Sequence, residues 1–108
     1  MDAIARFEQL LAQGRDNALL RFGLGQAYLK AGRARQAVEH LRQAVKHNPD
    51  YSAAWQVLGQ ALTALQQPEQ ALQAYESGIA VAQRKGDVQA SKVMQVLSKR
   101  VRKSQIVE

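Results

Sequence analysis

Apolar residues recur at intervals of three and four along most of this chain, which is the spacing of one face of an α-helix. Stretches rich in Gly, Pro, Asn, Asp or Gln interrupt this pattern, and no stretch of useful length alternates between apolar and polar residues. The interruptions lie at Gly14, Gly32, 47–50, 66–67 and 86–87. The pattern predicts an all-α chain of about six helices joined by short turns.

Residues beside the interruptions predict where several helices begin. Asp16 or Asn17 has a side chain suited to cap the second helix, and Ser52 is suited to cap the fourth. Pro68 suits the first turn of the fifth helix, because a helix leaves the N–H groups of its first turn unpaired and proline has none. We expect these positions to mark the starts of three helices.

The chain matches itself when it is shifted by 34 residues. The sequence LGQA at 24–27 falls on LGQA at 58–61, and the pair QA at 36–37 falls on QA at 70–71. Shifting back by another 34 residues aligns the first predicted helix with the second half of the repeat unit. This helix therefore looks like a half unit that lacks the first helix of the pair. The chain therefore contains two full units of a repeat and one half unit before them.

The period and the repeated residues resemble the tetratricopeptide repeat, whose pattern is W-x2-L-G-x2-Y, then A-x3-F, then P. Arg21 occupies the Trp position and Leu41 the Phe position of the first unit, while Leu62 and Gln83 occupy the Tyr and Pro positions of the second. The matching residues are Leu24, Gly25, Tyr28, Ala37 and Pro49 in the first unit and Trp55, Leu58, Gly59, Ala71 and Tyr75 in the second.

The resemblance implies a right-handed α-solenoid of about six antiparallel helices that forms a single domain over residues 1–108. The missing Pro at the end of the second unit implies that the fifth helix runs on to Gly86. The implied parts are a half-repeat helix at 1–14, repeats at 18–51 and 52–85, a basic capping helix at 87–103 and a tail at 104–108.

Gly59 lies inside a predicted helix, where glycine costs about 1 kcal/mol relative to alanine. In a tetratricopeptide unit two helices pack antiparallel, and the resemblance places Gly59 where their backbones come closest, with Ala71 opposite. It also places Trp55, Leu58 and Tyr75 in the space between the two helices. Burial of these side chains offsets the cost of the glycine, and we expect Trp55 to be a core residue.

The sequence offers no group of residues suited to catalysis. It has no cysteine, and its two histidines, His40 and His47, lie two helical turns apart, roughly 10 Å, too far to share one metal ion. Acidic residues are scattered among polar positions, and no phosphate-binding, zinc-protease or serine-hydrolase motif is present. We therefore predict no enzymatic activity, no cofactor and no metal.

The first residues do not resemble a secretory signal, and no apolar run approaches the roughly 18 residues that cross a membrane. We therefore expect a cytoplasmic protein without a membrane span.

In tetratricopeptide proteins the first helix of each pair lines a concave surface that binds other proteins. The surface implied here mixes apolar and amide groups and suits a peptide held around an apolar anchor at Phe22. The alternative is that neighbouring helices or a second copy cover part of it, Phe22 above all. The implied lining residues are Leu19, Phe22, Gln26, Lys30, Ala53, Gln56, Gln60 and Thr63, with Asp87, Ala90 and Met94 from the last helix.

The net charge of +6 is concentrated near the carboxyl end, where residues 84–108 hold seven basic and two acidic residues. The last helix has an apolar stripe that can cap the stack, formed by Ala90, Val93, Met94, Leu97 and Val101. Its other face carries a basic patch, formed by Lys92, Lys99, Arg100, Arg102 and Lys103. That patch is either a solvated face or a contact for RNA, an acidic protein or anionic lipid. The absence of interleaved aromatic residues disfavours nucleic acid.

The first predicted helix has an apolar face on an end without a cap, formed by Ile4, Phe7, Leu10 and Leu11. Homodimerisation through that end is therefore one prediction. The main prediction is a non-enzymatic scaffold that binds a peptide or protein segment in the concave groove. The alternative is a basic module that binds RNA or another polyanion through the last helix.

Overall fold

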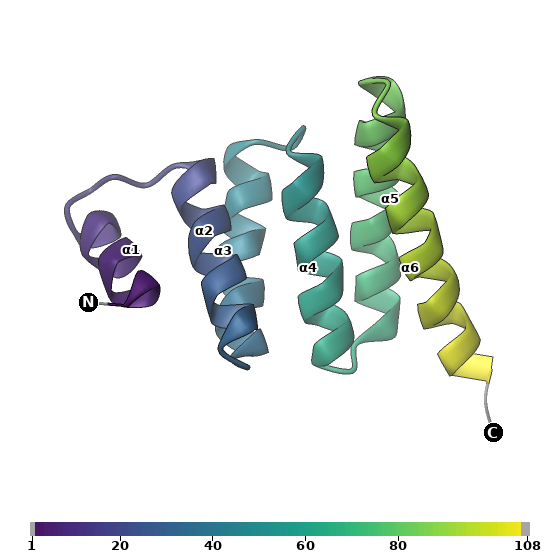
Figure 1. The fold of residues 1–108 in the computed structure, drawn as a ribbon, viewed down its shortest axis with the longest axis horizontal. Helices are drawn as coiled ribbons and strands as arrows, with labels where there is room; N and C mark the ends of the chain where they lie inside the picture. The colour runs from purple at the N-terminus through teal and green to yellow at the C-terminus, as the bar shows by residue number, and fades with distance from the viewer. Residues whose placement is uncertain (1, 107–108) are drawn as a thin grey trace.

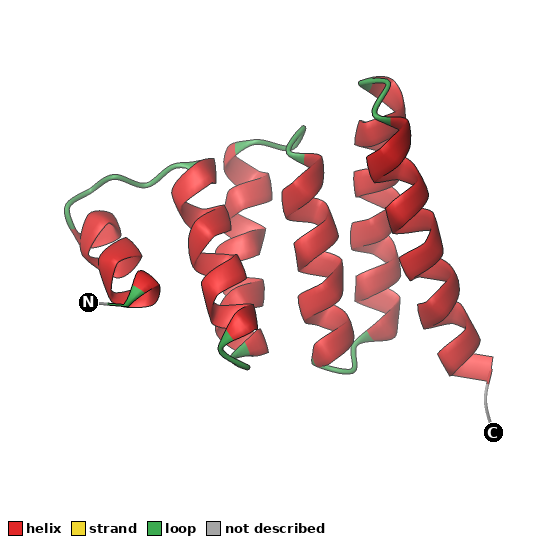
Figure 2. Cartoon of the chain, in the orientation of Figure 1, coloured by secondary structure: helices red, strands yellow, loops and turns green. Residues whose placement is uncertain are grey.

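The computed structural model describes residues 2–106, and it confirms the predicted all-α fold. Every regular element in this part of the chain is a helix (Figure 2). Short turns join the helices, as the interruptions of the pattern predict. The helices are α1 (Ala3–Ala12), α2 (Ala18–Lys30), α3 (Ala34–His47), α4 (Ser52–Ala64), α5 (Pro68–Arg84) and α6 (Val88–Ile106).

The helices stack in two layers (Figure 1). α2 pairs with α3 and α4 pairs with α5, each pair running antiparallel across a short turn. α2, α4 and α6 lie side by side in one layer, with α3 and α5 in the other. α1 packs against α2 at one end of the stack, and α6 covers α5 at the other.

The helix starts follow the sequence in most cases. Asn17 caps α2, since its side chain accepts a hydrogen bond from the backbone N–H of Leu20 at 2.8 Å. Pro68 is the first residue of α5, as predicted. The prediction that Ser52 caps α4 is wrong, because Ser52 is itself the first helical residue. Tyr51 precedes it without a side-chain cap.

Glycines allow the two helices of each pair to approach closely. A Cβ at Gly25 would overlap the side chain of Leu41 on α3, and one at Gly59 would overlap the ring of Tyr75 on α5. Leu41 and Tyr75 are fully buried, so neither side chain has free space to move into. Gly59 thus lies at a close contact within its pair, but the nearest atoms belong to the ring of Tyr75 and not to Ala71, which the resemblance placed opposite.

α5 is longer than α3, with 17 residues against 14. It runs to Arg84, which confirms that the missing Pro lets the helix continue toward Gly86. The added turn reaches back to the connection between α3 and α4. There Arg84 pairs with the carboxylate of Asp50, and the Lys85 amine donates to the Asp50 carbonyl at 3.1 Å.

The extra length of α5 changes the register of α6. α6 begins at Val88, 36 residues after the start of α4 at Ser52, whereas α4 begins 34 residues after the start of α2 at Ala18. The added length of α5 moves α6 away from the repeat period. Positions in α6 therefore do not follow from the repeat period.

Candidate binding groove

Three adjoining hollows run along the layer of α2, α4 and α6, and we call the surface that they form the groove. The first and second hollows share Phe7, Gly23 and Gln26, and the second and third share Gln60. The groove therefore extends from the junction of α1 and α2 to the carboxyl-terminal half of α6.

The first hollow lies between α1 and the amino-terminal half of α2 and has a volume of about 450 Å³. Its apolar wall includes Phe7, Leu10, Leu19 and Phe22. Leu19 is 72% exposed. Phe22 is half-buried because its ring packs against Tyr51, with 4.8 Å between the ring centroids. Phe22 thus offers one side to the hollow and is covered on the other.

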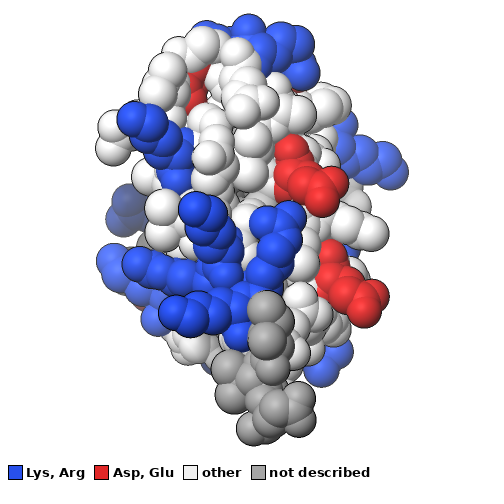
Figure 3. All heavy atoms as spheres, turned by 90° about the vertical axis from the view of Figure 1, so that its right-hand side faces the viewer, with Lys and Arg blue, Asp and Glu red and all other residues white. Residues whose placement is uncertain are grey.

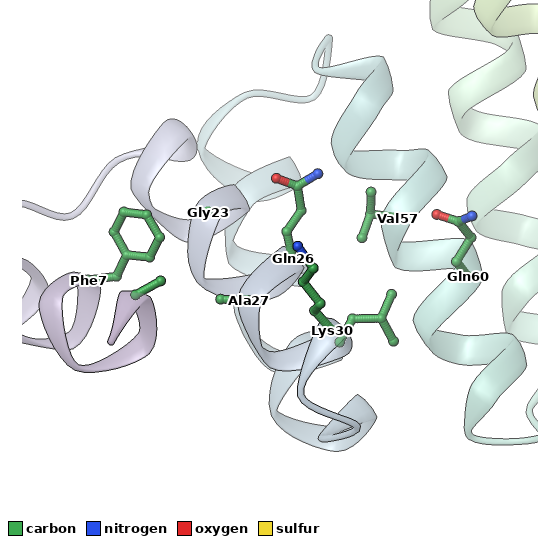
Figure 4. A pocket seen from close by; sticks show the side chains of 9 residues that line it. Phe7, Gly23, Gln26, Ala27, Lys30, Val57 and Gln60 are labelled. Carbon is green, nitrogen blue, oxygen red and sulfur yellow. The ribbon is translucent and has the colours of Figure 1, made fainter. Parts of the chain in front are cut away.

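The second hollow lies between α2 and α4 and has a volume of about 540 Å³. Figure 4 shows Gln26 and Lys30 on α2 and Val57 and Gln60 on α4 around this space, with Phe7 of α1 beyond α2. Gln26 and Lys30 are exposed, whereas Gln60 is half-buried. This hollow therefore combines an apolar floor with side-chain amides that have hydrogen-bonding capacity.

The third hollow lies between α4 and α6 and has a volume of about 270 Å³. Gln60 and Thr63 line it from α4, and Leu97 and Arg100 line it from α6. The Thr63 hydroxyl donates to the carbonyl of Gly59 at 2.8 Å, so it is held by its own helix. The surface of this hollow is mostly apolar, and Arg100 is the charged residue among those that line it.

The structure brings most of the predicted groove residues to this surface. Ala53 and Gln56 lie on α4 outside the three hollows, and Ala90 is half-buried near the start of α6. The predicted residues that line the groove are Leu19, Phe22, Gln26, Lys30, Gln60 and Thr63.

The prediction that Met94 lines the groove is wrong. Its side chain is fully buried against Gly78 of α5, because the register of α6 is shifted by the extra turn of α5. Leu97 of α6 lines the third hollow together with Gln60 of α4. Asp87 lies outside the three hollows and caps α6, because its side chain accepts a hydrogen bond from the N–H of Ala90 at 3.0 Å.

The sequence analysis placed Val93 in the apolar stripe of α6, and this prediction is wrong. Val93 is 36% exposed and lies on the outside of the helix, as do Val88 and Val96. Met94 and Val101 are buried within that stripe.

Sequence analysis missed the contribution of α1 to the groove. Phe7 packs over Gly23 of α2, where an added Cβ would lie 3.1 Å from the Phe7 ring. Gly23 is the signal that could have found this contact, because a glycine on the inner face of a helix leaves room for a neighbouring ring. Ile4 and Leu11 also pack against the core, so much of the apolar face of α1 is already used within this chain.

A chain of polar contacts joins α1, α2 and α3 beside the groove. The Tyr28 hydroxyl donates to the carboxylate of Glu8 at 2.6 Å, and His40 stacks on Tyr28 with 5.4 Å between the ring centroids. The His40 Nδ1 lies 3.0 Å from the Arg21 guanidinium, which can only donate. Nδ1 therefore accepts, and the proton of the neutral ring sits on Nε2, 3.7 Å from Glu8.

The environment of these groups shifts their pKa values. Burial lowers the pKa of His40, and the charge of Arg21 lowers it further, against the opposing effect of Glu8. The hydrogen bond to Glu8 raises the pKa of Tyr28. These contacts fix α1 against the first repeat, and burial favours the neutral form of His40.

Arg21 occupies the position of the Trp in the repeat pattern and serves a different purpose. Its guanidinium donates two hydrogen bonds to the Asp16 carboxylate, at 2.7 and 2.9 Å. The His47 Nε2 lies 3.0 Å from the same carboxylate. The bond from Arg21 lowers the pKa of Asp16 to about 2. Arg21 thus ties the α1–α2 connection to the first helix pair.

Trp55, the corresponding residue of the second repeat, is only half-buried. Its indole N–H donates to the carbonyl of Pro49 at 2.7 Å, and its Cβ lies close to Gly78. The expectation of a core residue therefore holds for the base of the side chain but not for the whole ring.

A cluster of Lys and Arg lies at the carboxyl-terminal end of the molecule (Figure 3). The basic patch predicted on α6 is exposed throughout, and none of its members forms an ion pair within residues 2–106. Arg100 belongs both to this patch and to the third hollow of the groove. The patch is therefore continuous with the groove.

In the part of the chain that the structure describes, no three His, Asp or Glu residues come together in an arrangement that could hold a metal ion. No helix there combines the length and the apolarity needed to cross a membrane.

The stacked antiparallel pairs, with glycines at the close approaches, define a helix-pair repeat protein of the α-solenoid class. The Tetratricopeptide repeat family model matches residues 2–41 and 28–97, and the chain belongs to this family. Tetratricopeptide repeats generally form protein–protein interaction modules.

Individual relatives support this assignment. A TPR repeat-containing protein of Pseudomonas aeruginosa is 49% identical over 98 residues, which cover 91% of this chain and 93% of that protein. The solution structure of a Bordetella parapertussis protein is 42% identical, with a TM-score of 0.86, and covers 100% of this chain and 94% of its own. The crystal structure of the Sgt2 TPR domain from Aspergillus fumigatus is 30% identical, with a TM-score of 0.77, over 90% of this chain and 64% of its own.

Proposed function

We propose that this protein is a non-enzymatic scaffold whose groove binds a peptide segment of another protein. The observation that supports this most strongly is the continuity of the three hollows across α1, α2, α4 and α6. A surface of that extent is matched by a segment of several residues rather than by a small molecule.

The chemistry of the lining supports the same proposal. Leu19, Phe22 and Leu97 offer apolar contacts at separate points along the groove. Gln26 and Gln60 lie between these points. A primary amide can both donate to and accept from a peptide backbone, so two of them can fix the direction of a bound chain. Apolar contacts supply affinity, and the amides set register.

Peptide display tests the proposal without a known partner. A library of random short peptides is selected on the immobilised protein, and the affinities of the enriched peptides are measured by fluorescence anisotropy. The variant Gln26→Ala/Gln60→Ala removes both amides. We expect it to weaken binding by about tenfold, because each lost hydrogen bond contributes about 0.5–1.5 kcal/mol.

The control variant Gln73→Ala/Gln89→Ala removes two exposed amides that lie outside the three hollows. Circular dichroism checks that both variants keep the helical fold. Equal loss of binding in both variants, or no enrichment over an unrelated bait, would show that the groove is not the binding surface.

The second candidate function is binding of a polyanion by the outer face of α6. The observation that favours it is the absence of ion pairs at Lys92, Lys99, Arg102 and Lys103 within the described residues. Binding of this kind depends steeply on salt. Changing these four residues to Gln would abolish it, while the groove variant Gln26→Ala/Gln60→Ala would leave it unchanged.

A further inference from the structure

We propose that the groove selects acidic segments, in which carboxylates accompany the apolar side chains that fill the hollows. This inference rests on the proposed function and adds the charge of the partner. It follows from the way in which this chain distributes its own charges between the groove and the rest of the surface.

Every charged residue that lines the groove is basic. Arg15 lines the first hollow, Lys30 the second and Arg100 the third. All three are exposed. None of them forms an ion pair within residues 2–106, whereas Arg21 and Arg84 elsewhere in the chain are paired with carboxylates. Three unpaired cations are therefore spread along the groove.

The acidic residues lie elsewhere, and most already have partners. Asp2 and Asp87 cap helices, and Glu8 is turned toward Tyr28 and His40. Asp16 binds Arg21, and Asp50 pairs with Arg84. The remaining acidic residues that the structure describes lie on α3 and α5 and do not line the groove, namely Glu39, Glu69 and Glu76.

The charge that lines the groove is therefore of one sign, although basic residues such as Arg35 and Lys46 also lie outside it. A segment bound in the groove meets positive charge in every hollow and no carboxylate from this chain. Glu or Asp in the partner gains an attractive interaction, while Lys or Arg is repelled. The apolar residues Leu19, Phe22 and Leu97 still require apolar side chains in the partner, so a purely acidic segment fits less well.

The cations of the groove also connect it to the basic patch on α6. Arg100 belongs to both, so an acidic segment that leaves the third hollow at Arg100 can contact the remaining cations of the patch. The groove and the patch, which the sequence presents as rival sites, can therefore act on one partner.

The composition and charge dependence of the selected peptides test this inference. We expect the peptides enriched on the wild-type protein to carry apolar residues and an excess of Asp and Glu. Replacing each Glu or Asp of an enriched peptide by Gln or Asn should weaken its binding by about two- to fivefold per contact and make it less sensitive to salt.

Matched variants place the effect in the groove. Lys30→Gln/Arg100→Gln removes two groove cations, and Arg35→Gln/Lys46→Gln removes the same charge from exposed positions of α3 that lie outside both the groove and the basic patch. The first variant should lose most of the preference for the acidic peptide over its amide form, and the second should retain it. Equal losses in both variants would show that net charge, not the groove, attracts the peptide.

The outcomes separate this inference from the proposed function. Enriched peptides that are neutral or basic, and that bind more weakly to Gln26→Ala/Gln60→Ala, would keep the groove and overturn the acidic preference. Enriched peptides that bind this variant as well as the wild type would overturn both. An oligouridylate that binds more tightly than any selected peptide, and loses affinity in Lys30→Gln/Arg100→Gln, would make the ligand RNA and overturn the proposal.

Discussion

The two repeats share one backbone arrangement but stabilise it with different side chains. In the first repeat, 18–51, the Trp position holds Arg21, which is tied to Asp16 by two hydrogen bonds. In the second, 52–85, it holds Trp55, which packs at Gly78 and bonds to a backbone carbonyl. One repeat is held at this position by charge and the other by apolar contact.

The comparison shows which positions the fold requires. Glycine is present at the close approach of both pairs, as Gly25 and Gly59, although the opposing side chain changes from Leu41 to Tyr75. The small residue is therefore needed for the approach of the helices, while the large residue opposite it is variable. The following predictions change one repeat at a time and compare it with the other.

The largest difference is expected at the Trp position. Trp55→Ala should lower the free energy of unfolding by about 3 kcal/mol, at the low end for loss of an aromatic side chain because the ring is half-buried. Arg21→Ala should lower it by about 1–2 kcal/mol, since it removes a partly exposed ion pair with Asp16 and the hydrogen bond to the buried His40. Urea unfolding followed by circular dichroism measures both. A larger loss for Arg21→Ala would contradict the assignment of charge and apolar contact to the two repeats.

The next effect concerns the close approaches. Gly59→Ala should destabilise the protein by about 2 kcal/mol, because the added Cβ meets the rigid, fully buried ring of Tyr75. Gly25→Ala should cost a similar amount, because the added Cβ meets the Cγ atom of Leu41, which is also fully buried. Thermal and urea unfolding measure both variants. A cost at only one of the two sites would show that the two repeats do not share this close contact.

The repeat period was sufficient to predict the fold and much of the groove. The spacing of apolar residues predicts the helices, and small residues that recur after 34 positions predict which helices pair. Leu19, Gln26 and Gln60 follow because their helices keep the repeat register. The helices, their pairing and these groove residues depend on local sequence and on the packing within one helix pair, and the chain contains two such pairs.

The repeat period did not predict the positions of residues in α6 and α1, where the chain departs from the repeat. Met94 was misplaced because the extra turn of α5, held by Arg84 at Asp50, shifts the register of α6. The contribution of Phe7 was missed because it depends on a contact between α1 and Gly23 that occurs once in the chain. Such features follow from packing between neighbouring units, which no repeated pattern records.

A pH-dependent difference is expected from His40, whose counterpart in the second repeat is Ala74. The pKa of His40 is lowered in the folded protein by burial and by Arg21, with Glu8 opposing. The unfolded state therefore binds more protons as the pH falls through the ordinary range of histidine, so the stability present above that range is lost below it. Urea unfolding between pH 7.5 and 5.5 should show this decrease in the wild type.

The variant His40→Gln separates this effect from the other titrating groups. It keeps a polar side chain beside Arg21 and Glu8 but cannot gain a proton. We expect its free energy of unfolding to fall less over the same pH interval than that of the wild type. An unchanged slope would assign the pH dependence to groups other than His40.

The smallest effect concerns the turns within the two repeats. Gly32 follows α2 with a φ of 79°, and Gln66 adopts a φ of 59° at the corresponding position after α4. A left-handed backbone favours glycine, so Gln66→Gly should stabilise the protein by about 0.5–1 kcal/mol, and Gly32→Gln should destabilise it by a similar amount. A Cβ at Gly32 would meet no atom within 4 Å, so the second change tests the backbone alone. Urea unfolding that gives opposite signs would show that the two turns are equivalent. A loss of stability in Gln66→Gly would show instead that the Gln66 side chain makes a favourable contact that Gly32 does without.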